Sequence, residues 1–230
     1  MRSVAFLLTE IIRAAFYFIS FLPLFLALSH FRSSPAGVLL LLLISGFYLG
    51  GIVFLSLLVL TKRLFVGSLK ANQVVTAESS LGKRFFFAST LNGMVHYSPF
   101  RLLVSGLSPL TAYYYRGMGA RMVPSVLTSP STRISDPWFV DIKENVTIGG
   151  DALILGHAGN GREIILGSVL IEAGAIIGAR SVILPNVRIG KDARVGAGAV
   201  VARGTVIPDG ETWAGVPARK IVPRSNAAGA

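Results

Sequence analysis

The fold is decided by residues 165–207, ILGSVLIEAGAIIGARSVILPNVRIGKDARVGAGAVVARGTVI, in which an aliphatic residue returns at every sixth position. Eight such residues follow one another without interruption: Ile165, Ile171, Ile177, Ile183, Ile189, Val195, Val201 and Ile207. An α-helix cannot use this period, because residues six positions apart point in widely different directions around its axis. Short strands joined by turns can use it, with the aliphatic residue of each hexad pointing inward.

Two other positions of the hexad fit such a coil. A small or β-branched residue lies four positions after nearly every aliphatic residue, as at Ala175 and Ala193, and suits a narrow corner. Glycine directly follows the aliphatic residue at Gly178, Gly190 and Gly196, where it permits tight backbone geometry. The same spacing appears twice upstream, with two extra residues in ISDPWFVD between the sets: Met122, Thr128 and Ile134, then Ile142, Ile148 and Ile154.

The spacing slips after Ile154, since Ile165 follows eleven residues later, about five more than one hexad. We expect a loop to leave the coil here, and this interval contains His157, the single histidine of the repeat. An imidazole, with an ordinary pKa near 6.5, can accept a proton at neutral pH. His157 is therefore the candidate general base, and Glu163 in the same loop either orients the imidazole or is a solvated charge.

The N-terminal part predicts membrane segments. Residues 37–60 form 24 uncharged positions, and a helix that rises about 1.5 Å per residue crosses a hydrocarbon core of roughly 30 Å over such a length. An earlier apolar stretch, residues 14–31, contains Pro23 and is sufficient if the flanking Arg13 and Arg32 snorkel. We predict a helical hairpin, and a signal peptide is the alternative for the first segment.

Charge is distributed unevenly along the chain. Residues 1–121 carry eleven basic and two acidic side chains, a net charge of +9, in the more apolar half of the sequence. This pairing favours an anionic membrane surface over nucleic acid as the partner. Basic residues also crowd the exit of the second apolar segment, which predicts that the following chain faces the cytoplasm of a bacterial inner membrane. These residues are Lys62, Arg63, Lys70, Lys83 and Arg84.

The sequence thus divides into a transmembrane hairpin (1–61), a juxtamembrane connector (62–117), a β-helix (118–222) and a disordered tail (223–230). Aromatic residues beside cations in KRFFFAST and LTAYYYRGMGAR are typical of a lipid headgroup region, but also of packing against the next domain. Both interpretations stay open. His96, in the connector, is expected to be structural or interfacial.

The repeat resembles the hexapeptide-repeat acyltransferases over roughly residues 118–222, most clearly in ILPNVRIGKDARVGAGAVVARGTVIPDG and in the closing WAGVPARKI. The closing segment is similar to that of the galactoside and maltose O-acetyltransferase branch, in which a histidine begins a looped-out segment, as Gly156 and His157 do here. The resemblance implies a mainly β fold, a left-handed parallel β-helix of triangular section, here preceded by two transmembrane α-helices. It also implies a homotrimer with sites between neighbouring prisms and acetyl-CoA or another acyl-CoA as co-substrate.

Further site residues follow from this resemblance. Asp136 falls where the branch has an acidic residue that contacts the acceptor, and Ser129 or Ser131 replaces an asparagine of the acceptor site, so Ser131 is a candidate substrate-binding residue. Backbone amides of Ala179 and Ala197 would contact coenzyme A. Three cations are candidates for its phosphates, through charge-assisted hydrogen bonds: Arg203, Arg219 and Lys220.

We therefore expect a membrane-anchored acyltransferase, most simply an O-acetyltransferase, that uses no metal and acts on a hydroxyl or amine of a membrane-proximal saccharide or lipid-linked acceptor. A carbonic anhydrase of this fold would need three zinc-binding histidines, and the repeat has one. Two alternatives stay open: a non-catalytic scaffold, or a terminal module of an amide-forming synthetase.

Overall fold

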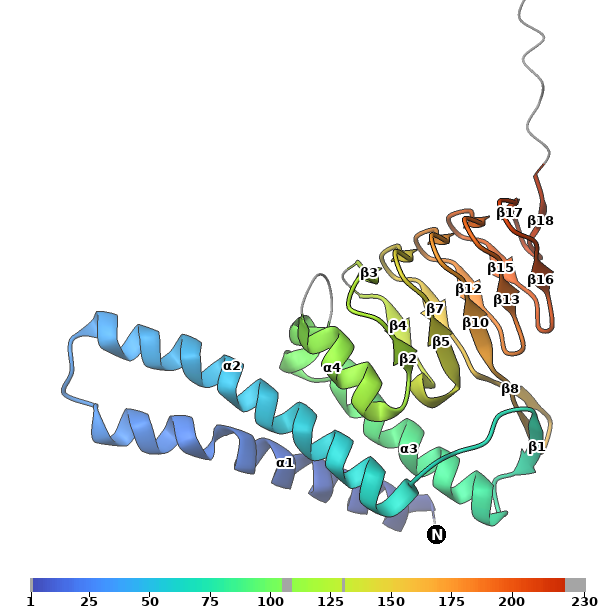
Figure 1. Ribbon diagram of the computed structural model, residues 1–230. Helices are drawn as coiled ribbons and strands as arrows, with labels where there is room; N and C mark the ends of the chain where they lie inside the picture. Colours follow the sequence, from blue (N-terminus) through green and yellow to red (C-terminus); the bar gives the residue numbers. More distant parts are fainter. Residues whose placement is uncertain (1, 105–108, 130, 222–230) are drawn as a thin grey trace, which may run out of the picture.

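A computed structural model describes residues 2–104, 109–129 and 131–221. Two antiparallel helices, α1 (Arg2–His30) and α2 (Ala36–Thr61), form an arm that extends away from the rest of the molecule (Figure 1). Both are long and apolar enough to cross a membrane, over Thr9–His30 and Ala36–Val66. The segment predicted as a disordered tail, residues 223–230, lies outside the described residues.

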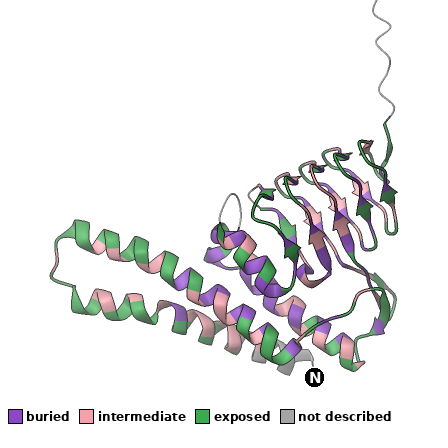
Figure 2. Ribbon diagram, viewed as in Figure 1, coloured by how far each residue is buried: buried purple, intermediate pink, exposed green. Residues whose placement is uncertain are grey.

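Burial differs between the two halves of this hairpin. Its far half exposes large apolar side chains, including Phe25 at 68% and Leu41 at 67% (Figure 2). Its near half is buried against the remaining protein, where Phe54, Leu55 and Leu58 have no exposed surface. The hairpin is therefore anchored at one end and presents an uncovered apolar surface at the other.

The repeat folds into a parallel β-helix with three flat faces, and each face is one parallel sheet. The first face contains β2 (Arg121–Met122), β5 (Val140–Ile142), β10 (Val169–Ile171), β13 (Arg188–Ile189) and β16 (Val206–Ile207). The second contains β3 (Leu127–Thr128), β6 (Thr147–Ile148), β11 (Ile176–Ile177), β14 (Arg194–Val195) and β17 (Thr212–Ala214). The third contains β4 (Arg133–Ile134), β7 (Leu153–Ile154), β12 (Val182–Ile183) and β15 (Val200–Val201). The short β18 (Arg219–Lys220) pairs with β17 in the antiparallel sense.

The hexad explains this architecture directly. On the first face the last residue of each strand stacks on its equivalent in the next coil, as Ile142, Ile171 and Ile189 do, and these side chains are at most 1% exposed. Small residues fill the corners: Ala152 and Ala199 are completely buried. The predicted parallel β-helix is confirmed.

Glycines serve two purposes in the turns. Nearly every turn contains one residue with positive φ, three positions before the inward residue, where Asn, Asp or Gly is favoured, as at Asn186 (φ 62°) and Gly204 (φ 75°). Gly178 is different, because a Cβ atom there would lie 2.4 Å from the backbone nitrogen of Ala197 in the next coil. It is glycine so that successive coils can stack closely.

The prediction that Ile165 points into the coil is wrong. Ile165 lies in β9 (Glu163–Leu166), which pairs with β8 (His157–Asn160) and β1 (Gln73–Thr76) in a small antiparallel sheet outside the prism. The next inward residue after Ile154 is therefore Ile171, so the insertion is about eleven residues long and not five. The inserted residues satisfy their backbone groups by pairing as a hairpin, and the six-residue step from Ile165 to Ile171 is coincidental.

The connector contains helices that the sequence did not predict: α3 (Ser80–His96), a 3₁₀ segment η2 (Pro99–Val104) and α4 (Pro109–Met118). They lie between α2 and the first coil (Figure 1). Among the connector aromatics, Phe85 is almost fully buried, as are Tyr114 and Tyr115, whereas Phe86 (45%) and Tyr113 (47%) are exposed. Packing against the next domain thus accounts for the buried rings, and only the exposed rings remain free to meet lipid.

Candidate active site

His157 is held by Asp136, a residue from the preceding turn on the same edge of the prism. The completely buried carboxylate of Asp136 lies 2.7 Å from the imidazole Nδ1 of His157, and the same oxygen accepts a 2.8 Å hydrogen bond from the Gly156 backbone N–H. A carboxylate can only accept a hydrogen bond, so in the neutral ring Nδ1 carries the proton and donates, and Nε2 keeps a free lone pair. No described residue bonds Nε2, and the side chain is 34% exposed, so a substrate can reach it.

The local sequence explains this geometry. The two extra residues of ISDPWFVD are accommodated by a short 3₁₀ segment of three residues, η3 (Pro137–Phe139), and Asp136 directly precedes it. At Gly156 a Cβ atom would lie 2.8 Å from the Cβ of Phe139 and 3.0 Å from that of Asp136. Any other residue would push the hairpin away from the carboxylate, which is why glycine precedes His157.

Two residues missed by the sequence analysis fix the strand that leads into Asp136. Asn92, on α3, donates from Nδ2 to the carbonyl oxygens of Ile134 and Ser135, both at 3.0 Å. Its Oδ1 accepts a 2.9 Å hydrogen bond from the hydroxyl of Tyr114 on α4. Both side chains are buried, so this network links the two connector helices to the edge of the prism that carries Asp136 and His157. The one feature of the sequence that could have indicated this network is the amide of Asn92, which lies on an otherwise apolar face of α3.

A second, smaller hydrophobic core supports the hairpin that carries His157. The ring of Phe85 meets the imidazole edge-to-face, with centroids 5.1 Å apart. Leu166 of β9 and Val75 of β1 are buried in the same core. Its other buried members are Val66, Leu69, Ala88 and Phe139. Since Val66 ends the π-helical turn η1 (Lys62–Val66) after α2, this core joins the site to the end of the second apolar helix.

The environment raises the pKa of His157 above its ordinary value of 6.5. The hydrogen bond to the Asp136 carboxylate is the main cause, burial opposes it, and the negative charge of Asp136 adds to it. The carboxylate therefore favours the imidazolium form, which is what a general base needs once it has accepted a proton. Glu163 does not contribute: it is exposed in β9, and no hydrogen bond between it and His157 is present in the described part of the chain.

The predicted acceptor residues are not brought together. Asp136 lies behind His157 with no exposed surface, a placement that suits orientation of the imidazole, and its contact with an acceptor stays a prediction. Ser131 has a positive φ of 64° and lines a cavity of about 270 Å³ together with His96 and Arg133, whereas His157 does not line it. Burial, and then the charge of Arg133, lower the pKa of His96 to about 4, so His96 is neutral at physiological pH.

The predicted donor residues lie along two different edges. Ala179 and Ala197 are exposed at equivalent turns between the second and third faces, and neither backbone N–H donates to another described residue. Arg219 pairs with Ala214 at the end of that edge. Arg203 instead lies in a turn between the third and first faces, the edge that carries His157. The fifth candidate, Lys220, forms an ion pair with Glu211 and is half-exposed.

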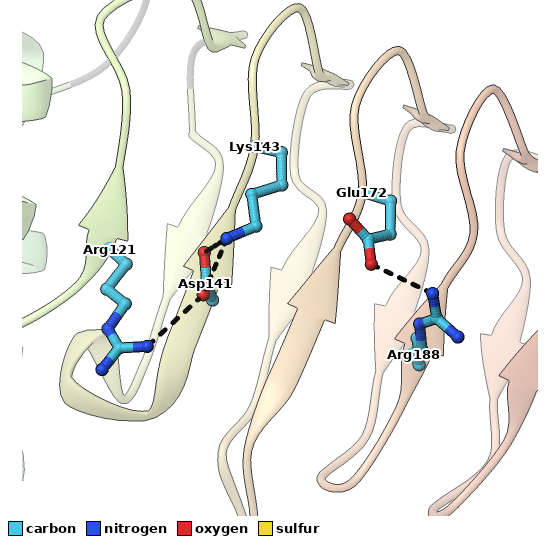
Figure 3. A network of polar contacts seen from close by, with 5 residues as sticks. All are labelled: Arg121, Asp141, Lys143, Glu172 and Arg188. Carbon is cyan, nitrogen blue, oxygen red and sulfur yellow. Dashed lines mark hydrogen bonds and ion pairs between the residues drawn. The ribbon is translucent and has the colours of Figure 1, made fainter.

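Other charged groups of the β-helix pair with one another. On the outside of the first face, Asp141 bonds Lys143 at 3.0 Å and lies 3.8 Å from Arg121, and Glu172 bonds Arg188 at 3.1 Å (Figure 3). Such exposed pairs contribute about 0–1 kcal/mol each. Within the described residues no group of three or more His, Asp or Glu side chains could hold a metal ion.

Comparisons with known proteins agree with the fold. Residues 168–203 match the family model "Bacterial transferase hexapeptide (six repeats)". Delta-poly-L-ornithine synthetase of Acinetobacter baumannii is 29% identical over 119 residues, which are 52% of this chain but 9% of that protein.

Solved structures match parts of the chain. AntD, an N-acyltransferase of Bacillus cereus in complex with dTDP and coenzyme A, is 27% identical with a TM-score of 0.32, over 36% of this chain and 50% of its own. A hexapeptide-repeat acetyltransferase of Vibrio cholerae is 19% identical with a TM-score of 0.44, over 63% and 93% of the two chains. From its six-residue spacing, its three-faced β-helix and the matching family model, this chain carries the bacterial transferase hexapeptide repeat.

Proposed function

We propose that this protein is a membrane-anchored acyltransferase that moves an acyl group from coenzyme A to a hydroxyl or amine, with His157 as general base. The observation that carries the proposal is the pair formed by His157 and Asp136, at the point where a hairpin leaves the prism. A buried carboxylate that fixes one ring nitrogen and leaves the other open to solvent is the arrangement that proton transfer requires.

The pair supports a simple sequence of bond changes. Nε2 of His157 accepts the proton of the acceptor as the acceptor oxygen or nitrogen attacks the thioester carbonyl carbon. The carbon–sulfur bond then breaks, and the imidazolium returns the proton to the departing thiolate. Asp136 stabilises the transient positive charge on the ring throughout, because their hydrogen bond is charge-assisted.

The positions of the donor residues favour an assembly. Ala179, Ala197 and Arg219 follow one edge of the prism, and His157 projects from another. If coenzyme A lies along the first edge, its thioester reaches a histidine most easily on a neighbouring copy. A homotrimer, with each site between two prisms, meets this requirement and is part of the proposal, as is acetyl-CoA as the first donor to try.

Membrane attachment is supported by the uncovered apolar half of the helical hairpin formed by α1 and α2. Side chains such as Phe25 and Leu41 are about two-thirds exposed, and burying apolar surface is favourable by about 25 cal/mol per Å². A bilayer would supply that burial. The basic residues after α2 favour an orientation with the β-helix on the cytoplasmic side of the bacterial inner membrane, where acyl-CoA is available, and this orientation is part of the proposal. A reporter that is active in the periplasm alone, fused after Ala230, should stay silent.

A direct assay tests the catalytic proposal. Detergent-solubilised protein is incubated with labelled acetyl-CoA, longer acyl-CoA species and a membrane lipid and saccharide extract. Release of free coenzyme A with transfer of label to an extract component is expected, and the His157→Ala protein of the same assembly size should transfer little. Equal transfer by both proteins would refute His157 as the base.

The match to Delta-poly-L-ornithine synthetase favours a second candidate, a module of an amide-forming synthetase. In that case the chain would act on, or only position, an amine substrate supplied by another protein. The isolated chain would then release no coenzyme A from acyl-CoA with any extract component, and that outcome separates this alternative, and a non-catalytic scaffold, from the acyltransferase.

A further inference from the structure

A cavity of about 670 Å³ lies where the end of α2, the length of α4 and the first coil of the β-helix meet. Figure 1 shows these three elements converging at the base of the hairpin. His157 does not line this cavity, so it is separate from the candidate active site. The lining residues that matter here are Val59, Arg63, Thr111, Tyr113, Arg116 and Met122.

The charge of this cavity is one-sided. Arg63 and Arg116 both line it, both are exposed, and neither forms an ion pair or hydrogen bond with another described residue. Among the described residues, no acidic side chain contributes to the lining. This contrasts with Arg121 and Arg188, which pair with carboxylates on the first face. Two unpaired guanidinium groups around one hollow favour an anion with several oxygens, such as a phosphate ester.

A polar group inside the cavity wall is also without a partner. Thr111 is 3% exposed, and its Oγ1 atom has no hydrogen-bond partner among the described residues. Thr111 lies in the first turn of α4, where the positive end of the helix dipole favours a negatively charged ligand. A buried hydroxyl without a partner costs free energy, and a ligand oxygen would relieve that cost.

The other side chains that line the cavity are mainly apolar, and they continue the apolar surface of the helical hairpin formed by α1 and α2. Val59 and Arg63 are four residues apart, on the same side of the helix that continues from α2 into η1. Met122, Val126 and Leu127 of the first coil add further apolar side chains to the lining. The cavity thus joins an apolar surface, at the end of a helix able to span a membrane, to a cationic rim. A soluble anion would use the rim alone, whereas a lipid would use both parts.

We infer that this cavity binds the phosphate headgroup of an anionic membrane lipid, with Arg63 and Arg116 holding the phosphate and Val59 contacting the start of the lipid chains. The inference rests on the membrane attachment proposed above but not on the acyl transfer chemistry. Lys62 takes no part, because it is buried with its Nζ atom 5.9 Å from the centre of the Trp138 ring.

Native mass spectrometry of the full-length protein in detergent tests this site. We expect phosphatidylglycerol to remain bound at least about tenfold more than phosphatidylcholine. The Arg63→Gln/Arg116→Gln protein should lose that preference, whereas the Arg194→Gln control, which changes an exposed arginine of the second face, should keep it. A double variant that retains phosphatidylglycerol as the wild type does would overturn the inference.

Two further arms separate the possible explanations. Glycerol 3-phosphate should compete poorly, since it lacks chains, and competition equal to that of the lipid would show a soluble phosphate as the ligand and overturn the lipid site. Thr111→Val should weaken phosphatidylglycerol binding several-fold while leaving the lipid-free protein as stable or more stable. A protein that fractionates with membranes yet shows no lipid preference refutes this site alone; a protein found in the soluble fraction refutes the membrane attachment on which it rests.

Discussion

Replacing the buried carboxylate with its amide, Asp136→Asn, tests the catalytic pair. The change keeps the shape of the side chain and an oxygen that can accept from the Gly156 N–H and from Nδ1, but it removes the negative charge 2.7 Å from the imidazole. In the proposed mechanism, the charge of the wild-type carboxylate stabilises the imidazolium that forms when His157 accepts the proton of the acceptor. The variant keeps the base in place and loses that stabilisation.

The structure sets the magnitude. A hydrogen bond to a charged group contributes about 1.5–3 kcal/mol, which corresponds to a fall in kcat of roughly tenfold to a hundredfold at about 1.4 kcal/mol per factor of ten. The smaller value applies if water screens the imidazole, whose side chain is 34% exposed. The KM for the acceptor should change little, because Asp136 has no exposed surface.

The pH profile supplies a second readout. The Asp136 hydrogen bond raises the pKa of His157 above 6.5, so the wild-type rate should fall as pH drops through that raised value and the ring becomes protonated. In the variant the pKa of His157 is lower, and the acidic limb should move to lower pH. The charged pair also adds to the free energy of unfolding of the wild type. This contribution should be complete below pH 6.5 and should be lost as pH rises through the raised pKa of His157 in the folded protein, whereas the variant should lack it.

The assay compares kcat, KM and the acidic limb for wild type, Asp136→Asn and Glu163→Gln with saturating acyl-CoA. Glu163→Gln is the matched control, because it neutralises an exposed carboxylate of the same hairpin that does not bond the imidazole. A variant Asp136→Asn protein with unchanged kcat and an unmoved acidic limb would refute the positioning role. A raised acceptor KM with wild-type kcat would instead support Asp136 as an acceptor contact.

Three other changes have definite expected outcomes. His157→Ala should lower kcat by about 10² to 10⁴-fold with coenzyme A binding retained in calorimetry; turnover within a few-fold of wild type would exclude the residue from catalysis. Gly178→Ala should destabilise the protein by about 1–3 kcal/mol in denaturant unfolding, because the new Cβ would lie 2.4 Å from a backbone nitrogen. The control Gly93→Ala, in α3, has no atom within 4 Å of the new Cβ and should stabilise the protein by up to about 1 kcal/mol. Equal effects of the two changes would contradict the close stacking of the coils. Arg219→Ala should raise the donor KM several-fold at nearly constant kcat, with Arg194→Ala unchanged; a loss confined to kcat would remove Arg219 from phosphate binding.

The sequence by itself determined the coil. A period of six excludes a helix, and each hexad reports which residue points inward, so short strands wound into a coil follow from the spacing. The triangular section followed from the resemblance to the hexapeptide-repeat acyltransferases. The same regularity located the interruption beside His157, since any insertion breaks the count. The length and composition of residues 37–60 likewise sufficed to predict a helix able to span a membrane.

Within the insertion after Ile154, the six-residue spacing no longer predicts which residues point into the coil. Ile165 matches the six-residue count but belongs to an antiparallel hairpin, because hydrogen bonding to β1 and β8, and not periodicity, fixes its position. No pattern within the insertion indicates its partner strand, which lies about ninety residues earlier in the chain, at Gln73–Thr76.

Only the tertiary structure decided which carboxylate meets the histidine. Glu163 is six residues from His157 and Asp136 is twenty-one, yet the coil returns the chain to the same edge after one turn and brings the distant residue into contact. The same holds for contacts made by the helices before the repeat, because no periodic pattern in the sequence predicts how these helices pack. Examples are the contacts of Asn92 and Phe85 and the position of Arg63 and Arg116 at the cavity. A repeat specifies its own contacts because each unit meets its neighbour at a constant separation, whereas contacts between the repeat and the rest of the chain are set by three-dimensional packing.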